Sequence, residues 1–300
     1  MEKMIVTSEM SEEKKRAHRL ANGRMIAGKT VVSIIIWAAA VIMVMPFLWM
    51  VSASFKTSKD VFNFPIEWIP ANPTLKGYIL LFRGGSTTVS IPTSIINSIK
   101  TSAMSMVGTF FACSLAGYAY AKIKFKGRDT MFMIKLSTTM IPSLVTMLPT
   151  YIVFAKIGLY DTLAALWLPY FLGGTFGVFL MRQAFMSIPD ELLESARIDG
   201  AGNFRCYWNI AIPNVKPALA TLVFLYFVWS WNDYTSALLY LRSTKLFTLP
   251  YAVATFSSKE YQNYPAIMAA DCIMLAPIMI FFFTCQDFFV NSLVTSGMKS

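Results

Sequence analysis

The sequence predicts an all-α membrane protein with six transmembrane helices. Of its 300 residues, 56% are hydrophobic and only 14% are charged, and the mean hydropathy is +0.54. A soluble domain of ordinary composition carries about 25% charged residues. The apolar stretches are long enough to cross a hydrocarbon core about 30 Å thick, because a helix rises about 1.5 Å per residue. Both observations place most of the chain in a lipid bilayer.

The first predicted span, at 31–55, contains no charged residue. It follows a mixed-charge tail at 1–30 that shows no signal-peptide cleavage pattern and that we expect to stay in the cytoplasm. Residues 31–300 then form one transmembrane domain, with a polar outer loop at 56–90. Further spans are expected at about 92–121, 130–155, 162–181, 217–239 and 265–289. Six crossings place both termini on one side of the membrane.

The distribution of lysine and arginine predicts the orientation of these spans. The tail, the turn at 122–128 and the loop at 187–216 are basic, and basic connections usually remain in the cytoplasm. The net charge of +10 therefore indicates contact with anionic lipid. No nucleic-acid partner is needed to explain it.

Metalloenzymes and hydrolases usually need residues that this chain lacks. Its four cysteines form no Cys-x-x-Cys pair, and its single histidine, His18, lies in the charged tail. We therefore expect no metal site, no cofactor and no histidine-based catalysis. An intramembrane enzyme also lacks a convincing pair of nucleophile and base.

One stretch, Gly23 to Thr30, matches the phosphate-loop pattern G-x-x-x-x-G-K-[ST]. A phosphate loop must follow a buried strand and open the helix of a βαβ unit. This stretch follows a charged helical tail and enters an apolar span, so nucleotide binding is not expected. Lys29 is better explained as an anchor on the cytoplasmic side.

A polar stretch from Ser187 to Pro213 separates the fourth and fifth spans. Ser187, with Asp190 three residues later, resembles a capping box that starts a short helix to about residue 198. Gly200 then occupies the position after a helix end, where a left-handed turn favours glycine. The stretch therefore begins as a helix that a glycine ends.

A second short helix is predicted immediately after this turn. Asn203 can cap it, the helix covers about 204–210, and Pro213 stops it. The predicted result is two short helices joined by a glycine elbow.

Polar side chains at membrane depth cost free energy and so require an explanation. Trp229, Asn232 and Asp233 are predicted to share one face of the fifth span, at i, i+3 and i+4. An aromatic ring beside an amide and a carboxylate suits a sugar. The alternative is an interfacial aromatic residue with a helix-end cap. Asp271 lies at a similar depth in the sixth span.

Prolines also interrupt the predicted spans. A proline is tolerated there when neighbouring helices or a cavity satisfy the freed carbonyl groups. These prolines are Pro142, Pro149, Pro169 and Pro277.

The polar stretch resembles the EAA signature of the permease subunits of bacterial ABC importers. The matching residues are Glu194-Ser195-Ala196, Asp199-Gly200-Ala201 and Ile210 to Pro213. A serine replaces the usual first alanine.

Other stretches resemble the carbohydrate branch of that family, the maltose-type permeases. They are Asn97-Ser98, Ala116 to Ala119, Met140 to Pro142, Gly158-Leu159, Trp231 to Tyr234, Met268 to Ala270, Gln286 and an altered tail at Gly297-Met298-Lys299.

The resemblance implies the fold of a type I ABC importer permease in the cell (inner) membrane, and a role in carbohydrate import. It implies that the loop at 187–213 is a coupling helix that docks on a separate ATPase. The implied partners are two ATPase subunits, a homologous second permease and an extracytoplasmic sugar-binding protein. ATP hydrolysis would take place on the partner chains.

Two alternatives remain open from the sequence. An ion-coupled secondary transporter would use Asp233 and Asp271 as titrating carboxylates, although such carriers usually show two related halves and none is visible here. The polar stretch could also be an ordinary amphipathic cytoplasmic loop.

Overall fold

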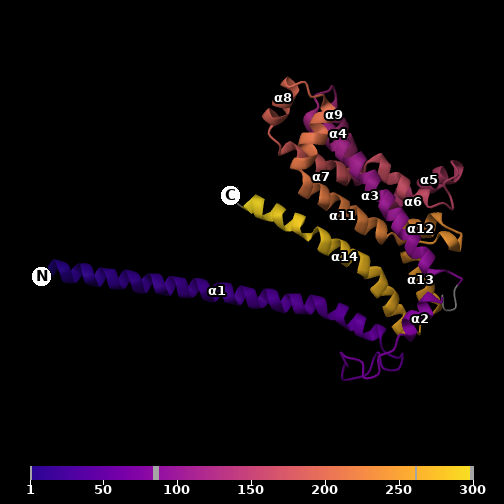
Figure 1. Cartoon of the computed structure of the whole chain (residues 1–300), viewed down its shortest axis with the longest axis horizontal. Coiled ribbons are helices and arrows are strands. Elements are labelled where there is room, and N and C mark those ends of the chain that lie inside the picture. The colour runs from indigo at the N-terminus through magenta and orange to yellow at the C-terminus, as the bar shows by residue number, and fades with distance from the viewer. Residues whose placement is uncertain (1, 84–87, 261, 298–300) are drawn as a thin grey trace.

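The computed structural model describes residues 2–83, 88–260 and 262–297, and all regular secondary structure within these ranges is helical. Side chains are described within residues 28–288. One long helix, α1, projects away from a bundle formed by the other helices (Figure 1). The predicted all-α fold class is confirmed. Met298 and Lys299 of the predicted tail motif lie outside the described residues.

The helices follow one another with short connections, except for the segment between α1 and α2. In order they are α1 (Glu2–Ser54), α2 (Lys76–Phe82), α3 (Ile91–Lys122), α4 (Arg128–Ser137), η1 (Thr138–Met140), α5 (Ser143–Lys156), α6 (Ala164–Trp167), η2 (Leu168–Leu172), α7 (Thr175–Met186), α8 (Asp190–Ile198), α9 (Asn203–Cys206), η3 (Tyr207–Ala211), α10 (Ile212–Asn214), α11 (Lys216–Trp231), α12 (Tyr234–Tyr240), η4 (Thr244–Leu246), α13 (Leu249–Lys259) and α14 (Tyr264–Gly297).

Four segments of the described chain are long and apolar enough to cross a membrane as they stand. They are Gly28–Ser54, Ile91–Lys122, Ala164–Met186 and Tyr264–Phe288. Two further segments qualify only as bent pairs: α4 and η1 with α5, which meet at 100°, and α9 to α10 with α11, which meet at 84°. The six predicted spans therefore compare with four plain spans in the described chain, or with up to six if each bent pair is counted as one span.

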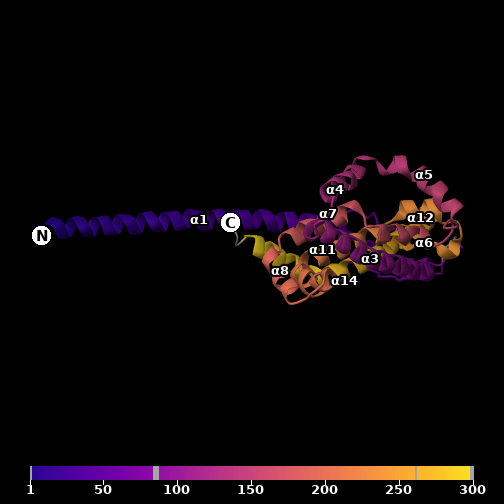
Figure 2. The ribbon, with the colours of Figure 1, turned by 90° about the horizontal axis from the view of Figure 1, so that it is seen from above.

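The bend between α4 and α5 corrects the expectation of one continuous helix at 130–155. Ile141 adopts an extended conformation, with φ −82° and ψ 117°, just before Pro142. Proline disfavours the helical conformation of the residue before it and cannot donate a backbone hydrogen bond. In Figure 2, α4 and α5 accordingly form an arch that stands away from the bundle.

Helix α1 begins in the predicted tail and continues into the first span without a break. The phosphate-loop pattern at 23–30 lies inside this helix and forms no loop. From Val31 onward the large apolar side chains are mostly exposed, including Trp37 at 73%. Such exposure suits a helix whose solvent is lipid.

Helix α3 runs along the bundle with α7 and α11 packed against it (Figure 1). Its buried face carries small residues, and Gly117 shows why: an added Cβ would lie 2.6 Å from Cβ of Met181 and 2.9 Å from the backbone nitrogen of Arg182. Only glycine lets α3 and α7 approach this closely.

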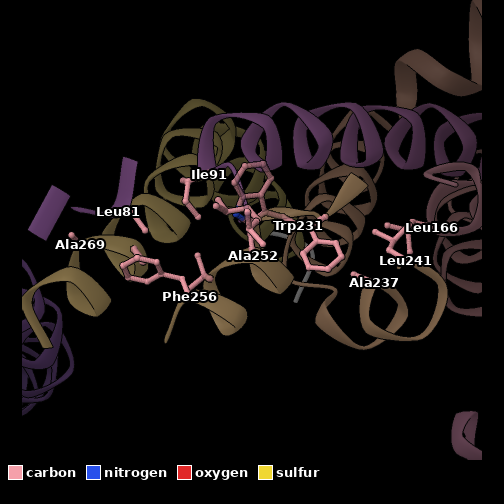
Figure 3. Packing of buried hydrophobic residues seen from close by; sticks show 14 of the residues in the cluster. Leu81, Ile91, Leu166, Trp231, Ala237, Leu241, Ala252, Phe256 and Ala269 are labelled. Carbon is pink, nitrogen blue, oxygen red and sulfur yellow. The ribbon is translucent and has the colours of Figure 1, made fainter. Parts of the chain in front are cut away.

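Two buried hydrophobic clusters lie near opposite ends of α3. One includes Ile91, Trp231 and Phe256, whose rings and branched side chains fill the space between α3, α11 and α13 (Figure 3). The other includes Tyr118 and Tyr207 and joins α3 to the α8–α10 region. The second cluster positions the candidate functional site.

Candidate functional site

Helices α8 and α9 lie together at one end of the bundle, beside the connection between α3 and α4 (Figure 1). Helix α8 begins at Asp190, and Pro189 precedes it in an extended conformation, with ψ 136°. The predicted cap at Ser187 is wrong, because its hydroxyl donates to the Ala184 carbonyl at 2.8 Å. Ser187 therefore helps to end α7 and does not start α8.

The turn at Gly200 has the geometry expected of a glycine after a helix end. Gly200 has φ +83°, and its N–H donates to the Arg197 carbonyl at 3.0 Å. The N–H of Ala201 donates to the Ala196 carbonyl at 2.9 Å. This pair of bonds is a Schellman motif, which satisfies the last carbonyls of α8 and fixes its angle to α9.

The second short helix differs from the prediction at both ends. Gly202 occupies the N-cap position, and the Asn203 side chain instead accepts a hydrogen bond from Arg197 at 3.4 Å. The helical path also continues past Pro213 to Asn214. It passes through one wider π-helical turn, η3, before the chain bends into α11.

Buried side chains anchor this loop to the bundle. Leu193 and Tyr207 are each 1% exposed. The Tyr207 hydroxyl lies 2.7 Å from that of Ser114 on α3, and its ring makes an edge contact with Tyr118. The loop therefore cannot shift without disturbing the end of α3.

Lys122, the last residue of α3, adds a polar tie. Its ammonium group donates to the Ile188 carbonyl at 2.6 Å and pairs with the Asp190 carboxylate. The lysine side chain is 6% exposed, whereas that of Asp190 is 72% exposed. The neighbouring Lys122 lowers the pKa of the Asp190 carboxyl group below its usual value.

The predicted coupling residues lie on the outer face of this anchored loop. Glu194, Ser195, Asp199, Gly200 and Pro213 are exposed, and Ala196, Ala201 and Ile210 are half-buried. The structure brings four of the eight together around one hollow of about 180 Å³. Its lining residues are Ala196, Asp199, Ala201, Arg205, Asn209 and Ile210.

Sequence reasoning missed four exposed apolar side chains on the same loop. Ile198 is 87% exposed, Phe204 is 69% exposed, Leu192 is 46% exposed and Trp208 is 44% exposed. Large apolar residues within a charged, polar loop were the available signal. These side chains are available for contact with another molecule.

The second predicted site, the shared face of Trp229, Asn232 and Asp233, is not formed. Helix α11 ends at Trp231, and the amide of Asn232 donates back to the Val228 carbonyl at 2.9 Å. Asp233 starts α12, where its Oδ1 accepts from the Ser236 N–H at 2.9 Å. Asp233 is therefore a helix-end cap, as in the alternative interpretation. Short polar side chains can hydrogen-bond to nearby backbone groups and so end one helix and begin another.

The four residues predicted to line a substrate path, Trp229, Asn232, Asp233 and Asp271, have different surroundings. The ring of Trp229 is 45% exposed and makes edge contacts with Phe176 and Tyr226. Asp271 is half-buried on α14. Of the four predicted path residues, Asp233 is the one that lines the cavity described next.

A cavity of about 580 Å³ lies between α5, the α6–η2 segment and α12. Its wall mixes hydroxyl groups with apolar side chains, and Asp233 is the charged residue in it. The lining residues are Ser143, Leu144, Thr146, Met147, Thr150, Phe154, Ala165, Leu166, Pro169, Tyr170, Asp233, Thr235, Ser236, Leu239 and Tyr240. Helix α5, which supplies one side of this wall, is part of the arch seen in Figure 2.

Comparison with known families decides what these two regions belong to. Residues 108–294 match the model of the family described as "Binding-protein-dependent transport system inner membrane component". The chain belongs to this family. The matched range contains both the α8–α10 loop and the cavity, so both are features of a transport-system membrane component.

Individual relatives agree with this membership. The chain is 33% identical over 262 residues to the arabinooligosaccharides transport system permease protein AraQ of Halalkalibacterium halodurans, covering 87% of this chain and 92% of that protein. It is 32% identical over 250 residues to the sn-glycerol-3-phosphate transport system permease protein UgpE of Yersinia pestis, covering 82% and 88%.

A solved structure shares the fold. A chain of a bacterial ABC transporter involved in the import of the acidic polysaccharide alginate aligns with a TM-score of 0.74 at 24% identity. The alignment covers 86% of this chain and 95% of that chain. The predicted ABC importer permease fold is confirmed.

Proposed function

We propose that this chain is the permease subunit of an ATP-driven importer that receives a sugar or oligosaccharide from a binding protein. The observation that carries the proposal is the α8–α10 loop. It is anchored by buried Leu193 and Tyr207, yet it leaves the apolar side chains of Ile198 and Phe204 exposed. Family membership supplies the setting, a binding-protein-dependent transport system.

The loop suits the transmission of movement from a separate ATPase. The ATPase would contact the exposed apolar side chains and the hollow at Ala196 and Ile210. The Schellman turn at Gly200 keeps α8 and α9 at one angle, so a push on either helix moves both. Tyr207 and Lys122 would pass that movement to α3.

The docking role extends over all the predicted coupling residues. They are Glu194, Ser195, Ala196, Asp199, Gly200, Ala201, Ile210 and Pro213.

The proposed assembly contains this chain, a homologous second permease, two ATPase subunits and an extracytoplasmic sugar-binding protein. A similar chain, with a TM-score of 0.60 at 17% identity, comes from a structure described as a bacterial alginate ABC transporter in complex with alginate pentasaccharide-bound periplasmic protein. The basic residues of the tail, the 122–128 turn and the 187–216 loop support a cytoplasmic position for this side. Both termini would then be cytoplasmic, with 1–30 as a tail and 31–300 as the permease domain.

The proposed cargo is a carbohydrate, which the similarity to AraQ supports. Within the part of the chain that the structure describes, Asp233 caps a helix and Asp271 lies outside the cavity lining, so neither carboxylate lends support to the ion-coupled alternative.

Reconstitution of the whole transporter in proteoliposomes tests the proposal. The chain is co-expressed with its partners, and uptake of a labelled oligosaccharide is measured with ATP in the lumen. We expect uptake that requires both ATP and the binding protein and that survives ionophores. Uptake that persists without ATP but collapses with the ion gradient would instead establish the ion-coupled carrier.

A further inference from the structure

We propose that the cavity between α5 and α12 is a binding subsite for a neutral saccharide, with the Asp233 carboxyl group as an acceptor for sugar hydroxyls. The inference rests on the proposed function and goes further by placing a substrate contact in this chain and excluding acidic substrates from it.

The cavity has the size and the mixed wall that a sugar needs. Its volume of about 580 Å³ lies within the range of about 300–1,000 Å³ for small-molecule sites. On α5, the hydroxyls of Ser143, Thr146 and Thr150 follow one helical stripe at i, i+3 and i+7. Apolar Met147 and Phe154 lie beside them and can cover the C–H faces of a sugar ring.

The hydrogen-bonding groups of the wall remain available to a ligand. The hydroxyls of Thr146 and Thr150 donate to α5 carbonyls at 3.0 and 2.7 Å, which leaves their lone pairs as acceptors. Oδ1 of Asp233 accepts from the Ser236 N–H, and among the described residues Oδ2 has no recorded partner. The phenols of Tyr170 and Tyr240 line the same space and add donors.

The charge of the wall selects against acidic substrates. Asp233 is a carboxylic acid, and no lysine, arginine or histidine lines the cavity. A uronate or a phosphate ester would bring a like charge toward Asp233 in a low-dielectric site without a cation to pair with it. A neutral sugar meets no such penalty and gains a strong acceptor.

The test uses the complete transporter in proteoliposomes and two substitutions that preserve the fold. Asp233→Asn removes the charge and keeps a side chain that caps helices equally well. Thr150→Val removes a hydroxyl at nearly constant shape. Thr139→Val, in η1 outside the cavity lining, is the matched control, since its hydroxyl also donates to a backbone carbonyl, at 2.7 Å.

Uptake of labelled arabinotriose and of labelled trigalacturonate is measured for each variant. We expect the wild type to prefer arabinotriose by at least about tenfold. Asp233→Asn should lower arabinotriose uptake by about tenfold, in line with loss of a hydrogen bond to a charged group. Thr150→Val should lower it by a smaller factor, and the control should match the wild type.

Three results would overturn a claim, each in a different way. Wild-type uptake of trigalacturonate as fast as that of arabinotriose contradicts the neutral assignment. Wild-type arabinotriose uptake with no loss in Asp233→Asn and Thr150→Val contradicts the subsite. Wild-type uptake of either probe that proceeds equally well without ATP contradicts the proposed function itself.

Discussion

The α8–α10 loop packs against the end of α3, and the α4–α5 arch follows α3 in the chain. The two regions differ in how much of their surface is buried. In the loop, Leu193, Cys206 and Tyr207 are buried almost completely. In the arch, Phe132 is the buried side chain of α4, and α5 has none among the described residues. The loop is packed as a rigid part of the bundle, whereas the arch stands free on one face.

This difference suits the two tasks proposed above for one transporter subunit. A loop that transmits force must move as a unit, and close packing makes it do so. A wall that admits a substrate must leave polar groups open to it, as Thr146 and Thr150 are on α5.

The largest expected effect comes from removing the main apolar anchor of the loop. Leu193→Ala deletes a side chain that is 1% exposed, and such core truncations cost about 2–5 kcal/mol of unfolding free energy. Leu144→Ala, on the arch at 75% exposure, is the matched control and should cost less than about 0.5 kcal/mol. Thermal unfolding of the purified complex in detergent measures both. Equal losses would show that the contrast is wrong.

A smaller effect is expected from the polar tie at the end of α3. Lys122→Ala leaves the Ile188 carbonyl without its 2.6 Å donor and should cost about 1–3 kcal/mol. Lys124→Ala, two residues later and exposed, should be nearly neutral. Differential hydrogen exchange of the 187–199 amides would localise the loss, and unchanged protection in Lys122→Ala would contradict the anchoring role.

The smallest expected effect concerns Asp161, which ties the connection after α5 to the segment after α12. Its carboxylate accepts from the N–H groups of Arg242 and Ser243 at 2.9 and 2.8 Å and from the Ser243 hydroxyl. The hydroxyl first, and then the backbone donors, lower the pKa of this carboxyl group. Because the group is partly exposed, Asp161→Asn should cost only about 0.5–1 kcal/mol at neutral pH.

The pH dependence of that effect has a definite sign. A depressed folded-state pKa contributes stability that is present above the unfolded value of about 3.9 and is lost as the pH falls through the folded pKa. The unfolding midpoints of wild type and Asp161→Asn should therefore converge below about pH 4. A difference between the two unfolding midpoints that stays constant from pH 7 to pH 3 would show that the charge of the Asp161 carboxylate does not strengthen these hydrogen bonds.

The sequence was sufficient to predict the features that depend on local chemistry. Hydropathy located the spans, and the position of Gly200 predicted the left-handed turn that the structure shows. Outcomes that depend on tertiary neighbours were not predictable. Pro149 and Pro277 lie inside helices, whereas Pro142 marks a 100° bend, although all three interrupt apolar runs.

The candidate sites follow the same division. The EAA residues could be located from their spacing, but the exposed side chains of Ile198 and Phe204 become evident only once the buried face of the loop is known. The break at Asn232–Asp233 depends on which backbone groups their side chains satisfy. Because that competition is settled by a few tenths of a kcal/mol to about 1 kcal/mol, helical spacing alone could not resolve it.

The central claim, that the angle between α8 and α9 couples an ATPase to transport, depends on Gly200. Within this chain its Cβ position is open, with no atom within 4 Å, so Gly200→Val disturbs the loop itself through the backbone at φ +83°. Gly202→Ala is the matched control, because that site is equally open but has φ −72°.

The most direct measurement is ATP-driven uptake and ATPase activity of the reconstituted transporter carrying each variant. A β-branched residue in the left-handed region costs at least about 1–2 kcal/mol, enough to displace α8 from α9. We expect Gly200→Val to lower uptake by at least about tenfold while the ATPase still turns over, with a much smaller loss in Gly202→Ala. Unimpaired uptake by Gly200→Val would contradict the coupling role of this loop.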